Sequence, residues 1–250
     1  MSDVHTDQSG ASMAPEGPAP IAVALDAPDL DTLRRWSTAV AATVSCLKVG
    51  LEAFCRDGHR SVQVAREGAV AGGVPDVDIF LDLKLHDIPA TVAGACRSVA
   101  SLEPQYLTVH AAGGPAMIEA AANALPGTRV TAVTVLTSLD AGLVEQLGIE
   151  GSPTDIVVRW ARMAVDAGAR AIVCSPMEVA VLRDALTTDV RLITPGVRPA
   201  GAEANDQRRS ATPQQAISDG ADLLVIGRPI TGHSDPGAAA RQIAIECRRP

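Results

Sequence analysis

Residues 78–101, DIFLDLKLHDIPATVAGACRSVAS, combine an aliphatic strand, a short turn and a helix. The run at 78–84 has little polar alternation, which is typical of a parallel strand buried on both faces. Ile88-Pro89 restricts the turn, because the residue before a proline is disfavoured in the helical region. A helical pattern then follows at 90–101. A strand that leads through a turn into a helix is the repeating unit of parallel α/β folds.

The same unit recurs along the chain. Runs rich in Val, Ile and Leu predict strands at 20–25, 44–49, 78–84, 106–110, 130–136, 170–174, 191–195 and 222–226. Helical patterns predict helices at 29–42, 58–71, 90–101, 115–124, 154–167, 177–186, 212–219 and 236–248. Eight alternating pairs predict an α/β fold, a single-domain (β/α)8 TIM barrel over residues 20–250. A doubly wound sheet usually has fewer strands and a G-x-G-x-x-G after the first one, where this sequence has none.

Composition limits the partners and the compartment. The 250 residues are 47% hydrophobic and carry a formal net charge of −8, which argues against a nucleic acid or an anionic membrane as partner. The apolar stretches are too short to span a membrane. Five scattered cysteines without a CxxC or a signal-peptide pattern predict reduced thiols and a cytoplasmic protein. Residues 1–19, rich in Ser, Pro and Gly, are predicted to be a disordered tail.

Candidate site residues follow from the fold, because reactive groups of such barrels project from the C-terminal ends of the strands. Polar residues at these ends are Asp26, Lys48, Asp82, Lys84, Asp87, His110, Thr137, Cys174, Ser175, Arg198, Gly227 and Arg228. Asp82 and Lys84 are two apart on one strand and should share its inner face, with alternate leucines turned to the helices. Asp26 and Lys48 end the two preceding strands and could complete an array of alternating charges.

Charges inside a barrel are costly unless they are paired. A salt-bridge network that only fixes strand register is one interpretation; a reactive array is the one we favour, because four ionisable groups converging there is an unusual way to gain stability. A lysine beside carboxylates stays protonated and can donate a proton. A carboxylate can repel a substrate carboxylate until CO2 leaves, and a cation stabilises the carbanion without metal or cofactor. A Schiff-base lysine requires desolvation or neighbouring cations that lower its pKa, whereas Lys84 is flanked by two aspartates.

The run D-L-K-L-H-D-I-P at 82–89 resembles the signature of the orotidine 5′-monophosphate decarboxylases. Other matching pieces follow in order: A-L-D at 24–26, L-K-V-G at 47–50, V-L-T-S at 135–138, T-P-G-V-R-P-A-G at 194–201 with D-Q at 206–207, and I-G-R-P-I at 226–230. The resemblance covers about residues 20–245. It implies cofactor-free decarboxylation of orotidine 5′-monophosphate to uridine 5′-monophosphate and CO2, the last step of pyrimidine nucleotide synthesis.

The resemblance also implies roles at the pyrimidine end of the substrate. Lys84 would donate the proton to C6, and Asp82 would stress the substrate carboxylate. Lys48 would bridge Asp82 and the ribose. Asp87 would enter the site from the partner subunit, with Thr91 one helical turn on. The implied assembly is a homodimer with shared active sites.

The same resemblance assigns Asp26 to a ribose hydroxyl and Thr137 to the pyrimidine edge. The phosphate would be held by Arg198, Gln207, Gly227 and Arg228. These residues suit that task, because strands seven and eight of such barrels often build a phosphate site. Glycine allows backbone N–H groups to approach closely, and arginine can grip phosphate with two hydrogen bonds.

Two other functions remain open. Hexulose-phosphate synthases and ketogulonate-phosphate decarboxylases share D-x-K-x-x-D and the fold but use Mg²⁺, with further acidic ligands around the site. Strands four and five end here in His110 and Thr137, so no metal is predicted. A non-catalytic barrel would bind a phosphorylated ligand without turnover, and the intact Asp82–Lys84 pair argues against it. His86 and His110 are left without a role, and Cys174 is assigned to the core.

Overall fold

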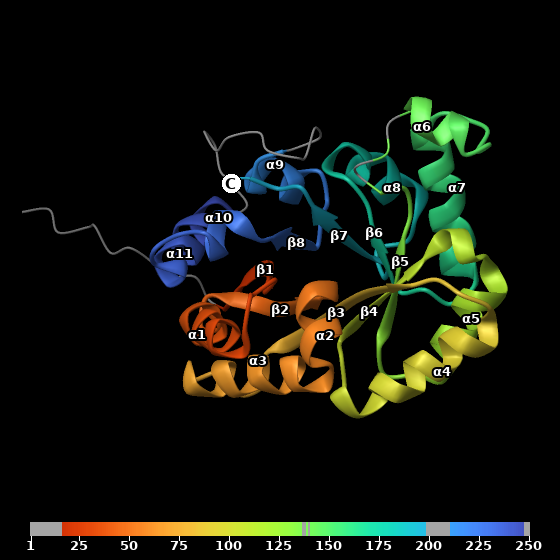
Figure 1. Cartoon of the computed structure of the whole chain (residues 1–250). Helices are drawn as coiled ribbons and strands as arrows, with labels where there is room; N and C mark the ends of the chain where they lie inside the picture. Colours follow the sequence, from red (N-terminus) through yellow and green to blue (C-terminus); the bar gives the residue numbers. More distant parts are fainter. Residues whose placement is uncertain (1–16, 137–138, 140, 199–210, 248–250) are drawn as a thin grey trace, which may run out of the picture.

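A closed barrel of parallel strands, in the order β1 to β8, forms the centre of the molecule (Figure 1). The computed structural model describes residues 17–136, 139, 141–198 and 211–247. The strands are β1 (Ala19–Ala24), β2 (Val44–Gly50), β3 (Asp78–Leu85), β4 (Tyr106–His110), β5 (Arg129–Val133), β6 (Ala171–Val173), β7 (Arg191–Pro195) and β8 (Leu223–Ile226). Ile21 of β1 pairs with Leu224 of β8, which closes the barrel and confirms the predicted fold.

Helices surround the barrel and connect successive strands (Figure 1). They are α1 (Leu30–Val40), α2 (Leu51–Asp57), α3 (His59–Ala71), α4 (Pro89–Val99), α5 (Pro115–Ala124), α6 (Ala141–Gln146), α7 (Pro153–Asp166), α8 (Val179–Ala185), α9 (Pro213–Ser218), α10 (Arg228–Thr231) and α11 (Pro236–Glu246). Several begin at side-chain caps that satisfy free N–H groups: Asp29 accepts from the Thr32 amide, and Asp235 from the Ala238 amide. α2, α6 and α10 are not among the predicted helices.

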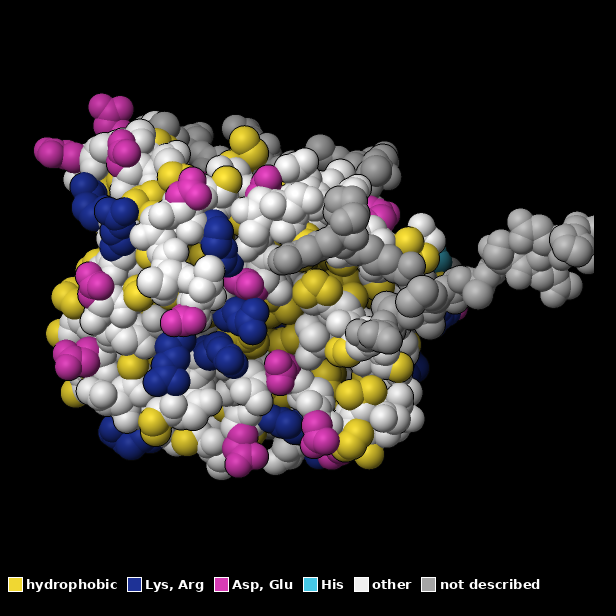
Figure 2. All heavy atoms as spheres, turned by 180° about the vertical axis from the view of Figure 1, so that it is seen from behind, with side chains coloured by type: hydrophobic (Ala, Val, Ile, Leu, Met, Phe, Trp, Pro, Cys, Tyr) yellow, Lys and Arg dark blue, Asp and Glu magenta, His cyan; other side chains and the backbone are white. Residues whose placement is uncertain are grey.

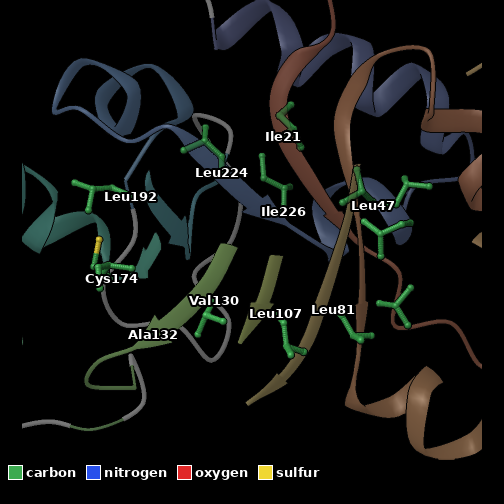
Figure 3. Close-up of a cluster of buried hydrophobic side chains, with 14 of the residues drawn as sticks. Ile21, Leu47, Leu81, Leu107, Val130, Ala132, Cys174, Leu192, Leu224 and Ile226 are labelled. Atoms are coloured by element: carbon green, nitrogen blue, oxygen red, sulfur yellow. The ribbon is translucent and has the colours of Figure 1, made fainter. Parts of the chain in front are cut away.

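Alternate strand residues build two packed layers. Ile21, Leu47, Leu81, Leu107 and Leu224 are fully buried in the layer between strands and helices (Figure 3). Their neighbours Ala22, Cys46, Phe80, Tyr106, Ile193 and Leu223 form a second cluster inside the barrel. The next inward positions after Cys46, Phe80 and Tyr106 are Lys48, Asp82 and Thr108, because side chains alternate along a strand. The inner cluster therefore lies directly beneath three polar residues that point into the barrel.

Strand β3 departs from regular alternation where it carries Lys84. Leu81 pairs with Leu107 and Leu85 pairs with Val109, so four steps along β3 match two along β4. This β-bulge coincides with a φ of +49° at Lys84. The prediction that Asp82 and Lys84 share a face through regular alternation is therefore wrong: their side chains meet, but across an irregular segment.

The surface of the molecule carries charges of both signs. Figure 2 shows acidic side chains beside basic ones on one face of the molecule. In the ranges that the structure describes, no helix is both long and apolar enough to cross a membrane. The predicted tail at 1–19 overlaps the described residues only from residue 17 onward, and Thr137 and Gln207 lie outside them.

Candidate active site

Asp82 is the centre of the charged array. Both of its carboxylate oxygens accept hydrogen bonds of 2.8 Å from Lys84 Nζ. Lys48 Nζ lies 3.2 Å from Oδ2, and the Thr108 hydroxyl donates to Oδ1 at 2.9 Å. The Asp82 side chain is 12% exposed. This carboxylate is thus fixed from three directions by groups on β2, β3 and β4.

Lys48 extends the array towards β1. It is buried, and its Nζ lies 3.8 Å from Oδ1 of Asp26, which is about half-exposed. Gly50 leaves the space for this pair: a Cβ there would lie 2.8 Å from Asp26 Oδ1 and 2.9 Å from Lys48 Nζ. The charges therefore alternate from Asp26 through Lys48 and Asp82 to Lys84, as predicted.

The electrostatics of Asp82 favour its ionised form. Burial alone would raise the pKa of this carboxyl. The ammonium groups of Lys48 and Lys84, with hydrogen bonds from Lys84 and Thr108, outweigh burial and hold the pKa below its ordinary value. Asp82 therefore presents a fixed negative charge at neutral pH.

A pocket of about 160 Å³ opens above the inner cluster. Asp82 and Lys84 supply its charges. The rest of the lining is mostly apolar and comes largely from the opposite strands: Phe80, Val133, Val135, Leu136, Val173, Cys174, Pro195 and Val225. Charges facing an apolar wall interact more strongly than they would in water. The arrangement can therefore act electrostatically on a bound anion and donate a proton.

The structure shows the surroundings of Cys174, His86 and His110. Cys174 is buried, its Sγ lies 4.0 Å from Thr194 Oγ1, and burial raises the pKa of its thiol to about 12. That agrees with its assignment to the core. The rings of His86 and His110 have centroids 5.4 Å apart. Burial, followed by His86 and Lys84, lowers the pKa of His110, so its neutral form is favoured.

Asp87 and Thr91 stand apart from the array of their own chain. Residues 86–91 are all exposed, and Ile88 is 65% exposed. The Asp87 carboxylate accepts from the Ile88 amide at 2.6 Å. Across the described part of the chain, no ion pair joins Asp87 to Lys48 or Lys84. The turn after β3 therefore presents a carboxylate and an apolar side chain outward.

The predicted phosphate residues lie after β7 and β8. Pro195 and Val225 are paired across these strands, and Arg198 and Arg228 each follow three residues later. The Arg198 amide donates to the Ala211 carbonyl at 3.0 Å, which joins the two ends of the segment between them. A Cβ at Gly227 would make an ordinary van der Waals contact with the Ala24 Cβ, at 3.4 Å. The structure thus places both arginines at the same end of the barrel as Asp82.

Sequence reasoning misses Thr108 and Gly50 as parts of this site. Thr108 is a polar residue inside the aliphatic run YLTVH, and that interruption is the signal that could have identified it. Gly50 ends the run L-K-V-G two residues after Lys48, on the same face. Among the residues that the structure describes, no three His, Cys, Asp or Glu side chains form a group suited to holding a metal ion.

Comparison with known proteins gives a consistent result. The model of the orotidine 5′-phosphate decarboxylase / HUMPS family matches residues 19–243. The orotidine 5′-phosphate decarboxylase of Thermobifida fusca is 59% identical over 231 residues, covering 92% of this chain and 97% of that protein. The one from Frankia casuarinae is 56% identical over 241 residues, covering 92% and 88%. The crystal structure of orotidine 5′-phosphate decarboxylase from Lactobacillus acidophilus has a TM-score of 0.77 at 33% identity, covering 92% and 99%.

Proposed function

The chain belongs to the orotidine 5′-phosphate decarboxylase / HUMPS family, and from that premise we propose that it decarboxylates orotidine 5′-monophosphate to uridine 5′-monophosphate and CO2. Its relatives of 59% and 56% identity carry the name of that activity. The observation that carries the proposal is the Asp82–Lys84 pair, with contacts of 2.8 Å, at the edge of a largely apolar pocket. A cytoplasmic enzyme of pyrimidine nucleotide synthesis follows from this reading.

In the proposed mechanism the charges of the array do the chemistry without a cofactor. The carboxylate of the substrate approaches Asp82, and their repulsion is relieved when the C–C bond breaks and CO2 departs. The electron pair left on C6 is stabilised by the Lys84 ammonium group. Lys84 then transfers a proton from Nζ to C6 and regains one from solvent. The apolar wall strengthens both electrostatic effects by excluding water.

The remaining substrate contacts are assigned by the same proposal. Lys48 links Asp82 to the ribose, and the half-exposed Asp26 binds a ribose hydroxyl. Thr137 reads the pyrimidine edge. Arg198, Gln207, Gly227 and Arg228 hold the phosphate. Binding energy from the phosphate would then help to press the substrate carboxylate against Asp82, as remote contacts do in other enzymes.

We also propose a homodimer in which Asp87 and Thr91 complete the partner's site. The exposed turn at 86–91 and the exposed Ile88 support this assembly, because an isologous two-fold contact uses one patch twice.

Mixing inactive variants tests the shared site. Lys84→Ala and Asp87→Ala homodimers should each be nearly inactive. After subunit exchange at equal amounts, about half the dimers are heterodimers, each with one undamaged site, so roughly a quarter of all sites regain activity. Persistent inactivity, with exchange verified by mass spectrometry of differently tagged subunits, would refute the shared site.

The reaction itself is tested by following the absorbance of orotidine 5′-monophosphate with purified protein and excess chelator. Loss of substrate and formation of uridine 5′-monophosphate at an unchanged rate support the proposal. Activity that disappears with chelator and returns with Mg²⁺ would favour the Mg²⁺-dependent branch of the family. Tight binding of uridine 5′-monophosphate without any turnover would favour a non-catalytic binding protein.

A further inference from the structure

We propose that Thr108 is a positioning residue that holds Lys84 and Asp82 in their paired geometry, an inference that rests on the proposed function of that pair. The Thr108 hydroxyl accepts a hydrogen bond of 2.8 Å from the backbone N–H of Lys84. It donates one of 2.9 Å to Asp82 Oδ1. One buried hydroxyl therefore connects the backbone of one charged residue to the side chain of the other.

The backbone at Lys84 needs such support. Its φ of +49° is uncommon for a residue with a side chain, and within the described residues only Glu103 shares this property outside glycine. Residues held in such conformations persist when their surroundings fix them, and they cluster at functional sites. The bulge removes Lys84 from the regular register with β4, and Thr108 supplies the acceptor that its N–H needs.

A hydroxyl group suits this position for a chemical reason. It carries one donor and two acceptor lone pairs, so it can serve an N–H group and a carboxylate at once. Valine has nearly the same shape but can do neither. Serine keeps the hydroxyl and loses only a methyl group. The pair Thr108→Val and Thr108→Ser therefore separates hydrogen bonding from packing.

The chain offers a matched control in Thr131. This residue is the register partner of Thr108 on β5 and is equally buried. Its hydroxyl donates to the Arg129 carbonyl at 2.9 Å, and in the described part of the chain no hydrogen bond joins it to Asp82 or Lys84. Thr131→Val thus removes a hydroxyl from the same level of the barrel without touching Asp82 or Lys84.

The test measures kcat and KM for orotidine 5′-monophosphate in wild type and the three variants. Thr108→Val should lower kcat about 10- to 100-fold, the effect of losing a hydrogen bond to a charged group, with KM little changed. Thr108→Ser should recover most of kcat, and Thr131→Val should keep it. Wild-type kcat in Thr108→Val, or an equal loss in Thr131→Val, would overturn the positioning role.

Crystal structures of the wild type and Thr108→Val separate this inference from the proposed function. In the valine variant, Lys84 should leave the positive-φ conformation or lose contact with Asp82. If both features persist unchanged, Thr108 does not position the pair, whatever the enzyme turns over. An inactive wild type would refute the proposed function, while the structural comparison would still decide the role of Thr108.

Discussion

Ion-paired aspartates lie at both ends of the barrel, and two of them, Asp222 and Asp82, are held in different ways. At the N-terminal end, Asp222 accepts from Arg183 at 2.5 Å, from Arg191 at 3.2 Å and from the Leu192 amide at 2.8 Å. At the C-terminal end, Asp82 is held by two lysines and a threonine. Both carboxylates have several partners, so pairing alone does not distinguish a structural cluster from a reactive one.

The difference lies in what else the cations contact. Arg183 also donates to the carbonyls of Val190 and Gly220, so it joins α8 to the loops that enter β7 and β8. Lys84 lines the pocket, and its backbone is held in an unfavourable conformation. In barrels of this kind, residues at the N-terminal face serve stability and those at the C-terminal face serve catalysis. Substitutions at the two ends should therefore affect different measurements.

The largest effect is expected from Lys84→Ala. Loss of the proposed general acid should lower kcat by at least 10²- to 10⁴-fold, and loss of carbanion stabilisation adds to that. Affinity for uridine 5′-monophosphate should change little. Stability should fall somewhat, because Asp82 loses one of the two ammonium groups that stabilise its ionised form. Single-turnover kinetics and product binding measure the two quantities. A variant with more than about a tenth of the wild-type rate would exclude Lys84 as the acid and direct attention to Lys48.

Arg228→Ala should have the next largest effect. A charged hydrogen bond to phosphate contributes about 1.5–3 kcal/mol, so kcat/KM should fall about 10- to 100-fold. The variant should also lose much of its preference for the nucleotide over the nucleoside orotidine. Arg60→Ala, at an exposed arginine of α3 paired with Glu67, is the control and should change neither quantity. An unchanged preference in Arg228→Ala would remove this arginine from the phosphate site.

Asp222→Ala should affect stability and leave catalysis intact. The substitution removes the acceptor of the Leu192 amide and one acceptor of each of two arginines, which should cost about 1–3 kcal/mol of unfolding free energy. Urea denaturation measures this cost, and kcat per folded molecule should match wild type. Normal stability combined with a large loss of kcat would contradict the division of roles between the two ends.

The sequence predicts the barrel because buried parallel strands have a strong local signal. Each aliphatic run lies within a few residues of an observed strand, and the largest discrepancy is β5, which ends at Val133 instead of residue 136. Register and bulges depend on neighbouring strands, so they leave little local trace. The spacing of Asp82 and Lys84 therefore predicts their proximity but neither the bulge between them nor the positive φ at Lys84.

The charged part of the site is predictable for a related reason. Ionisable residues that interrupt or end aliphatic runs are conspicuous in the sequence. In a parallel barrel the C-terminal ends of all strands lie at one face, so these residues are brought together. Thr108 and Gly50 are less conspicuous, because a threonine suits a strand and a glycine acts here only by leaving space. Whether Asp87 acts in its own site or in a partner's depends on a second chain, which no pattern within one chain specifies.

The smallest expected effect is on how the free energy of unfolding depends on pH, and it involves two aspartates of β3. Asp78 begins β3 and Asp82 lies near its end. Burial raises the pKa of Asp78 above its ordinary value of 3.8, although Arg129 and Arg66 oppose it. The lysines outweigh burial at Asp82 and lower its pKa. The folded chain therefore holds a proton more tightly than the unfolded chain at Asp78 and less tightly at Asp82. Ionised Asp78 opposes folding at neutral pH, and ionised Asp82 favours it.

Two amide substitutions should separate these contributions. Asp78→Asn removes a cost that exists only when the carboxyl is ionised, so the variant should gain a little stability at neutral pH, up to about 0.5 kcal/mol as for other half-exposed positions. The gain should vanish as the pH falls below the folded pKa of Asp78, because Asp78 is then protonated in wild type and no longer carries the partly buried charge that opposes folding. Asp82→Asn should lose stability at neutral pH, and the loss should shrink as acid protonates Asp82 in wild type. Urea denaturation across the acidic range measures both differences. If the two variants changed with pH in the same direction, the two ends of β3 would not hold their carboxylates in opposite ways.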